Sequence, residues 1–164
     1  MTKPKFVRDR KTGERAEQYV QGIFHCAGIA TVQNDGSKEE LVGWDFAFRL
    51  EGKEFRVEVK NDIYEAKSGN IAVEYYNPKL CKPSGIMATH AHFWVYVLAD
   101  RSAWMCSALS LLDHVNNVAP FREIACGGDS NAAMKLYRRD ELFETLFVRI
   151  DDGADIVEAI KEIT

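Results

Sequence analysis

The sequence predicts an α/β fold in which helices flank a central mixed β-sheet, with a core order of helix, three strands, helix and strand. Three observations lead to this prediction: an early stretch of helical periodicity, two adjacent stretches of strand periodicity, and alternating helical and strand-like segments after them. The chain has 164 residues, 46% hydrophobic and 28% charged, as in a soluble globular protein. We expect one domain over 1–164, with a basic N-terminal arm over 1–11 and a C-terminal helix over 153–164.

The first helix is expected from about Thr12 to Ala27. Its apolar residues recur three or four positions apart and form one stripe. Thr12 suits the N-cap position, and Gly28 follows the stripe as glycine often follows a helix end. A short strand is expected next, over 29–32. The stripe consists of Ala16, Val20, Ile23, Phe24 and Ala27.

Residues 43–60 are expected to form a β-hairpin, because apolar and polar residues alternate in both of its halves. The pair Glu51-Gly52 between the halves is typical of a two-residue turn. With this turn, Phe48 faces Phe55, and the other apolar residues also face one another. The same register places Asp45 directly opposite Glu58.

The rest of the chain alternates between strands and helices. The continuous apolar run over 93–98 predicts a buried central strand. Ser107 is expected to cap a helix through Val115, with Leu109 and Leu112 facing inward. Further strands are expected over 71–76 and 121–125, and further helices over 140–147 and 154–163.

The net charge of −4, taken alone, argues against a nucleic-acid partner. The distribution is uneven, since residues 1–15 carry a net charge of +4 and residues 140–164 carry −6. The basic end could contact a polyanion, but ordinary surface charge is the simpler explanation and the one that the charge pattern alone favours. Four separated cysteines without a CxxC pair indicate free thiols, so we expect a cytoplasmic location. Without an apolar run of membrane-helix length, we expect no membrane partner.

The acidic pair of the hairpin suggests a chemistry. Two carboxylates facing each other across a sheet repel, and a divalent cation between Asp45 and Glu58 would remove the repulsion. Lys60, two residues further along the same face, could stabilise a negatively charged transition state. These are the components of metal-assisted phosphodiester hydrolysis. Alternatively, the pair lies on an exposed face where Arg56 and Lys60 neutralise it.

The segment from Asp45 to Glu58-Val59-Lys60 resembles the D…(D/E)-x-K core of the PD-(D/E)xK nucleases, which have the restriction-endonuclease-like fold. Trp44 stands where the family pattern has proline. Glu17, eleven residues before Gly28, resembles the glutamate on the first helix of archaeal Holliday-junction resolvases. More loosely, residues 69–96 resemble bacteriophage-type members of the superfamily.

This resemblance implies a Mg²⁺-dependent DNA endonuclease in which Mn²⁺ can substitute. Asp45 and Glu58 would be metal ligands together with the backbone carbonyl of Val59. Lys60 would position the attacking water or stabilise the charge that develops on the phosphate. Glu17 would bind a second metal or orient water on the first. The catalytic residues would thus be Glu17, Asp45, Glu58 and Lys60.

The implied partner is DNA, whether duplex, branched or single-stranded, and many members of this fold act as homodimers. The enzyme would be phage-type or structure-selective and would act in the cytoplasm of a bacterial or phage-infected cell. Two alternatives are an inactive nucleic-acid-binding module of the same fold and an unrelated α/β interaction protein. Candidates for contact with nucleic acid are Arg10, Lys11, Glu74, Lys79, Lys82 and Ser84.

Overall fold

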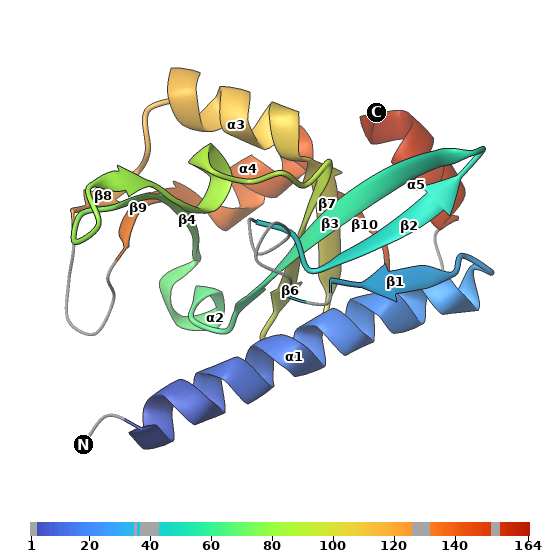
Figure 1. Ribbon diagram of the computed structural model, residues 1–164. Helices are drawn as coiled ribbons and strands as arrows, with labels where there is room; N and C mark the ends of the chain where they lie inside the picture. The colour runs from blue at the N-terminus through green and yellow to red at the C-terminus, as the bar shows by residue number, and fades with distance from the viewer. Residues whose placement is uncertain (1–2, 35, 37–42, 126–131, 152–154) are drawn as a thin grey trace.

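Two β-sheets organise the chain, as Figure 1 shows for a computed structural model. The structure describes residues 3–34, 36, 43–125, 132–151 and 155–164, with side chains from residue 11 onward. The first sheet has six strands in the order β1-β2-β3-β6-β7-β10: Thr31–Gln33, Phe46–Leu50, Lys53–Asp62, Phe93–Leu98, Ala103–Ser107 and Val148–Arg149. The second has four strands in the order β5-β4-β9-β8: Lys82–Pro83, Asn70–Asn77, Ala133–Arg138 and Arg122–Ile124.

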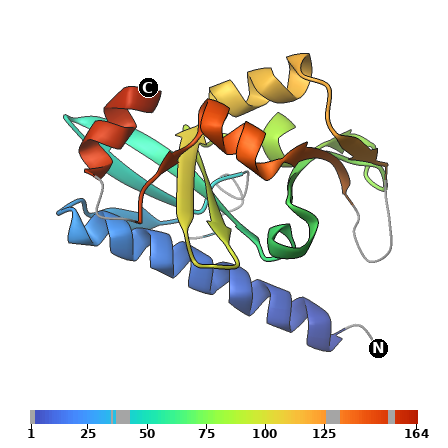
Figure 2. The ribbon, with the colours of Figure 1, turned by 180° about the vertical axis from the view of Figure 1, so that it is seen from behind.

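Helices cover both faces of the six-stranded sheet. Figures 1 and 2 show α1 crossing one side of the molecule and α3 and α4 lying on the other. Among the described residues, none of the helices combines the length and the apolar character that a membrane span requires. The helices are α1 (Lys3–Cys26), α2 (Glu65–Ser68), the 3-10 turn η1 (Gly85–Met87), α3 (Ala108–Asn117), α4 (Arg139–Leu146) and α5 (Ile156–Ile163).

Helix α1 is longer than the sequence predicts. It begins at Lys3, so the predicted start and N-cap at Thr12 are wrong, and much of the expected basic arm is helical. The apolar stripe that identified the helix starts only at Ala16, and a pattern of buried residues does not reveal turns that precede it. The predicted end is confirmed. Gly28 has a φ of 78°, and the N–H of Ile29 donates to the carbonyl of Phe24 at 2.9 Å.

The β2–β3 hairpin has the predicted turn and register. Glu51 and Gly52 both have positive φ, as a type I′ turn requires. The pairing runs from Leu50 with Lys53 to Phe46 with Val57 and stops there. Asp45 lies in a bend before β2, and its N–H donates to the carbonyl of Val57 at 2.7 Å. The predicted ladder pairing of Asp45 with Glu58 is therefore wrong, because the backbone leaves the ladder one residue earlier.

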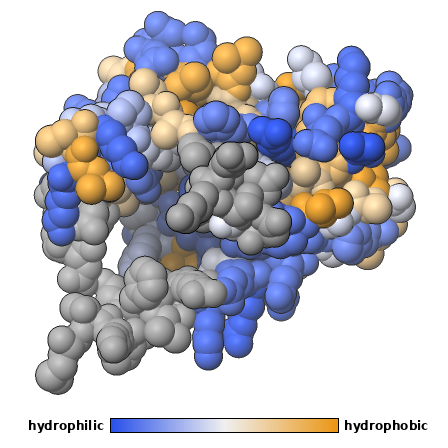
Figure 3. Space-filling model, viewed as in Figure 1, coloured by the Kyte–Doolittle hydropathy of each residue, from blue (hydrophilic) through white to orange (hydrophobic). Residues whose placement is uncertain are grey.

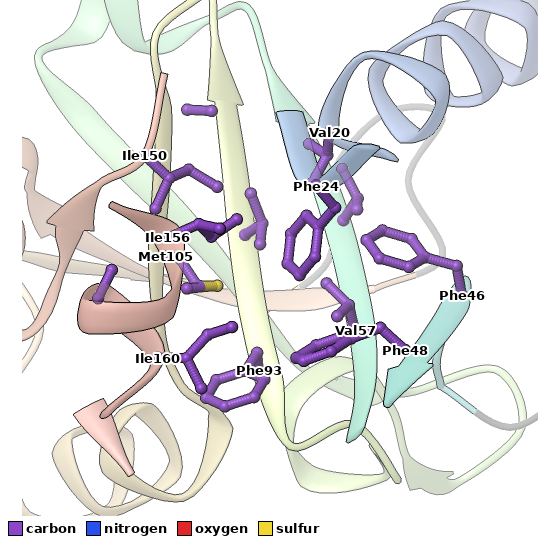
Figure 4. Close-up of a cluster of buried hydrophobic side chains, with 14 of the residues drawn as sticks. Val20, Phe24, Phe46, Phe48, Val57, Phe93, Met105, Ile150, Ile156 and Ile160 are labelled. Carbon is purple, nitrogen blue, oxygen red and sulfur yellow. The ribbon is translucent and has the colours of Figure 1, made fainter. Parts of the chain in front are cut away.

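The predicted central strand is confirmed as β6, whose six residues are all buried. It runs parallel to β3 and antiparallel to β7. One hydrophobic core lies between the six-stranded sheet and helices α1 and α5, and Figure 4 shows its aromatic and aliphatic side chains meeting. A second core lies on the opposite face, against β4, α3 and α4, and includes Trp94, Tyr96, Leu111 and Phe143.

Most of the strands and helices predicted after residue 60 are present, but several of the strands form a second sheet. The strand predicted over 71–76 is β4, which belongs to the second sheet. Ser107 caps α3 and accepts a hydrogen bond from Ser110 N–H at 3.5 Å. The inward prediction for Leu109 is wrong, since it is 73% exposed and Leu111 faces the core instead. Strands β7 and β9 were not predicted, because buried and exposed residues do not alternate regularly along them.

Candidate active site

Strand β3 places Glu58 and Lys60 on the face opposite the first hydrophobic core. Val57 and Val59 point into that core, so the alternating residues Glu58 and Lys60 point the other way. Glu58 is only 8% exposed. Lys60 forms an ion pair with Glu58, and its Nζ lies 5.2 Å from the centroid of the Trp94 ring. The Glu58 side chain of the ion pair is thus largely covered, while Lys60 lies beside the Trp94 ring with 37% of its side chain exposed.

Asp45 reaches the same place from the bend before β2. Its Oδ2 accepts a hydrogen bond from the N–H of Val59 at 2.6 Å, which fixes the carboxyl group against β3. Burial raises the pKa of Asp45 to about 7, and the negative charge of Glu58 adds to this effect. The hydrogen bond from Val59 and the charge of Lys60 act in the opposite direction, whereas Glu17 raises the pKa further. Two carboxylates therefore repel each other in a partly buried position.

The Lys60 ammonium is held in its charged form. Burial alone would lower its pKa, but the charge and the hydrogen-bond acceptor of Glu58 raise it, and Asp45 and Glu74 raise it further. The net effect is a pKa above the usual value for lysine. At neutral pH this side chain is therefore a cation and a hydrogen-bond donor.

Glu17 lies half-buried on α1 and completes the group. Its Oε2 accepts a hydrogen bond from Gln33 Nε2 at 3.1 Å, and its charge acts on Asp45. The charges of Glu17, Glu58 and Lys60 all act on Asp45, so α1, the bend before β2 and strand β3 bring these four side chains into one neighbourhood. Sequence reasoning missed Gln33, because a glutamine in a three-residue strand belongs to no motif.

Glu74 and Ser84 lie where β4 meets η1. The charge of Glu74 acts on Lys60, which places it on the same side as the candidate site. Gly85 has a φ of 53°, and a Cβ there would lie 2.3 Å from the Glu74 carbonyl oxygen, so the two backbones touch. Among the described residues, the buried Oγ of Ser84 has no hydrogen-bond partner.

The predicted basic contact residues lie further from this group. Lys79 and Lys82 are exposed, and Lys82 pairs with Asn77 at the end of β4, beyond Glu74. Lys11 is exposed on α1, and the side chain of Arg10 lies outside the described residues. Figure 3 shows hydrophilic residues along the visible side of the described part of α1.

The donor set suits a hard divalent cation. The described residues contain no group of three or more His, Cys, Asp and Glu side chains arranged around one metal position. Mg²⁺ is usually held by one or two carboxylates, with waters and substrate phosphates as its other ligands. The repulsion that raises the Asp45 pKa is a feature that a cation beside Asp45 and Glu58 would remove. The residues present therefore fit Mg²⁺, while the predicted role of the Val59 carbonyl stays a prediction.

Comparison with known proteins supports the fold. No protein-family model and no curated protein matches the chain. Among solved structures, the chain is similar to a bacterial homing endonuclease, I-Ssp6803I, with a TM-score of 0.51 and 17% sequence identity. The match covers 63% of this chain and 72% of the homing endonuclease. At this identity the likeness shows the fold alone, and it confirms the predicted restriction-endonuclease-like arrangement of helices around a mixed sheet.

Proposed function

Since the chain has the restriction-endonuclease-like fold, we propose that it is a Mg²⁺-dependent endonuclease that hydrolyses phosphodiester bonds of DNA. The observation that carries the proposal is the meeting of Asp45 and Glu58, two carboxylates that repel each other, beside the Lys60 ammonium. Burying one carboxylate near the charge of another costs stability unless a proton or a cation compensates it, so a purely structural sheet gains nothing from such a pair.

The four clustered side chains have separate roles in this proposal. Asp45 and Glu58 would hold the cation together with the Val59 carbonyl, and Glu17 would orient water or hold a second cation. When bound, Mg²⁺, or Mn²⁺ in its place, lowers the pKa of a coordinated water and neutralises charge on the phosphate. Asp45 is kept in position by the N–H of Val59, so this ligand is oriented before any cation arrives.

Lys60 acts as an electrostatic group and not as a base. Its raised pKa keeps it protonated at neutral pH, so it cannot accept the proton of the attacking water. It can instead donate a hydrogen bond to a phosphate oxygen, where negative charge develops during hydrolysis. The Trp94 ring beside it restricts where the ammonium can move.

The proposed partner is DNA, and the basic residues of α1 are the first candidates for contact with its backbone. Lys11 and Arg15 are exposed on the same helix that carries Glu17. Cations along one helix attract phosphates without reading sequence. A homodimer and a cytoplasmic location belong to the same proposal, and light scattering of the purified protein tests the first of these.

A cleavage assay tests the function directly. Purified protein is incubated with supercoiled plasmid, a synthetic four-way junction or single-stranded DNA, in Mg²⁺, Mn²⁺ or EDTA. We expect cutting that requires metal and is lost in Asp45→Ala and Lys60→Ala. Lys53→Ala is the matched control, because Lys53 is an exposed lysine on the same strand β3 and should leave cutting intact.

Other outcomes would contradict the proposal. Binding of DNA without cutting under every metal condition would identify an inactive binding module of this fold. Neither binding nor cutting of any of the three DNA forms would exclude both functions. Cutting that survives in both variants would show that a different site, or a contaminating nuclease, is responsible.

A further inference from the structure

A row of polar side chains joins helix α1 to the edge strand β1 and ends at the candidate active site. On α1, Glu17, Gln21 and His25 occur at every fourth position and therefore lie on one face. On β1, Thr31 and Gln33 are two residues apart and share one face of the strand. Four helical residues rise about 6 Å and two strand residues about 6.7 Å, so the two rows remain in step.

Four hydrogen bonds connect these five side chains in sequence. His25 Nε2 lies 2.9 Å from Thr31 Oγ1, and Thr31 Oγ1 donates to Gln21 Oε1 at 2.9 Å. Gln21 Nε2 donates to Gln33 Oε1 at 2.5 Å. Gln33 Nε2 then donates to Glu17 Oε2 at 3.1 Å. The Glu17 carboxylate is the last acceptor of the chain.

All four bonds have the same polarity. The Thr31 hydroxyl has one proton, which it gives to Gln21, so His25 Nε2 must be the donor in the first bond. A carboxylate can only accept, so the other end of the chain is fixed as well. Turning over the Gln33 amide would place its oxygen against Glu17 and its nitrogen against Gln21 Nε2, and both of its bonds would be lost. The amide is therefore held in one orientation from two sides.

We propose that Gln33 is a positioning residue that holds the Glu17 carboxylate beside Asp45 and Glu58, and that Gln21 and Thr31 orient the Gln33 amide for this task. Its catalytic consequence rests on the proposed function. The charge of Glu17 acts on Asp45, so the placement of Glu17 affects how the carboxylates share a divalent cation. Gln33 needs no contact with DNA for this role.

Metal binding and cleavage test the catalytic consequence. In Gln33→Ala we expect the affinity for Mn²⁺, measured by calorimetry, and kcat to fall about three- to tenfold, the net contribution of one ordinary hydrogen bond. The KM for DNA should not change, whereas general damage to the fold would alter KM and the melting temperature as well. Gln18→Ala is the matched control, since Gln18 is an exposed glutamine of the same helix and should behave as wild type.

A measurement without metal or DNA separates this inference from the proposed function. In the metal-free protein, the side-chain NH₂ resonance of Gln33 should shift in Glu17→Gln and remain unchanged in Gln18→Ala. If wild type neither binds Mn²⁺ nor cuts DNA, the proposed function fails, and the resonance still decides whether Gln33 holds Glu17. An unshifted Gln33 resonance in Glu17→Gln would overturn the inference. So would a Gln33→Ala protein that binds Mn²⁺ and cuts DNA as an active wild type does.

Discussion

Replacing Asp45 by asparagine should make the metal-free protein more stable above neutral pH while abolishing cleavage. The folded protein holds a proton on Asp45 up to a pKa of about 7, compared with 3.8 for the free side chain. Between these two values the folded state binds more protons than the unfolded state. The free energy of unfolding of wild type therefore falls as the pH rises through this range. Asparagine does not titrate, so the variant escapes this loss.

The size of the effect follows from the shift. Each pKa unit is worth about 1.36 kcal/mol, so the interval from pH 5 to pH 7 corresponds to roughly 3 kcal/mol. The side-chain oxygen of asparagine can still accept the hydrogen bond from Val59 N–H, so the variant does not leave that donor unpaired. The advantage of Asp45→Asn over wild type should therefore grow by about 3 kcal/mol between pH 5 and pH 8.

Urea unfolding in EDTA at pH 5, 6, 7 and 8 measures this difference. Adding Mg²⁺ at pH 8 should stabilise wild type more than the variant, because the cation relieves the same repulsion. A constant difference between the two proteins across this pH range would refute the reasoning. A variant less stable than wild type at pH 8 would show that Asp45 is not destabilised by its neighbours.

Three further substitutions test the fold through chemical denaturation. Gly85→Ala should lower the free energy of unfolding by more than about 2 kcal/mol, because the new Cβ would lie 2.3 Å from the Glu74 carbonyl oxygen. Gly13→Ala, at an open position in a helix, should instead raise the free energy of unfolding by up to about 1 kcal/mol. Asp155→Ala removes the side-chain cap of α5 and should cost about 1 kcal/mol; no loss would mean that the cap does not stabilise the helix. Met105→Ala empties a fully buried position and should cost about 2–5 kcal/mol, and a smaller loss would indicate that the first core collapses into the space.

The parts of the fold that the sequence predicts well have one buried and one exposed face. Phe46 and Phe48 belong to the first core and Ala47 between them does not, so the side chains of the hairpin alternate with a period of two. Strand β7 could not be found this way, because Met105 and Cys106 are both fully buried and point into different cores. Strands β4 and β9 are far apart in the chain, and no residue pattern in either strand predicts that the two pair.

Only the part of the candidate site that lies on a regular strand could be predicted from the sequence. A period of two places Glu58 and Lys60 on one face, and this follows from the sequence alone. The ladder ends before Asp45 because the backbone bends there, and no residue pattern predicts this bend. Gln33 reaches the candidate site only because β1 packs against α1, which the sequence does not predict. The four-residue spacing of Glu17 and Gln21 could have suggested a row of polar side chains on one face of the helix.

Strand β6 makes the two hydrophobic cores one cooperative unit. Phe93, Val95 and Val97 belong to the first core, while Trp94 and Tyr96, between them, belong to the second. Neither core can open without moving the strand that supports the other, so unfolding should be a single transition. Tryptophan fluorescence, to which Trp94 in the second core contributes, should then report damage done in the first core. The unfolding curve from fluorescence should coincide with that from backbone circular dichroism. A change in stability at either core is thereby transmitted to β3, the neighbour of β6 that carries Glu58 and Lys60.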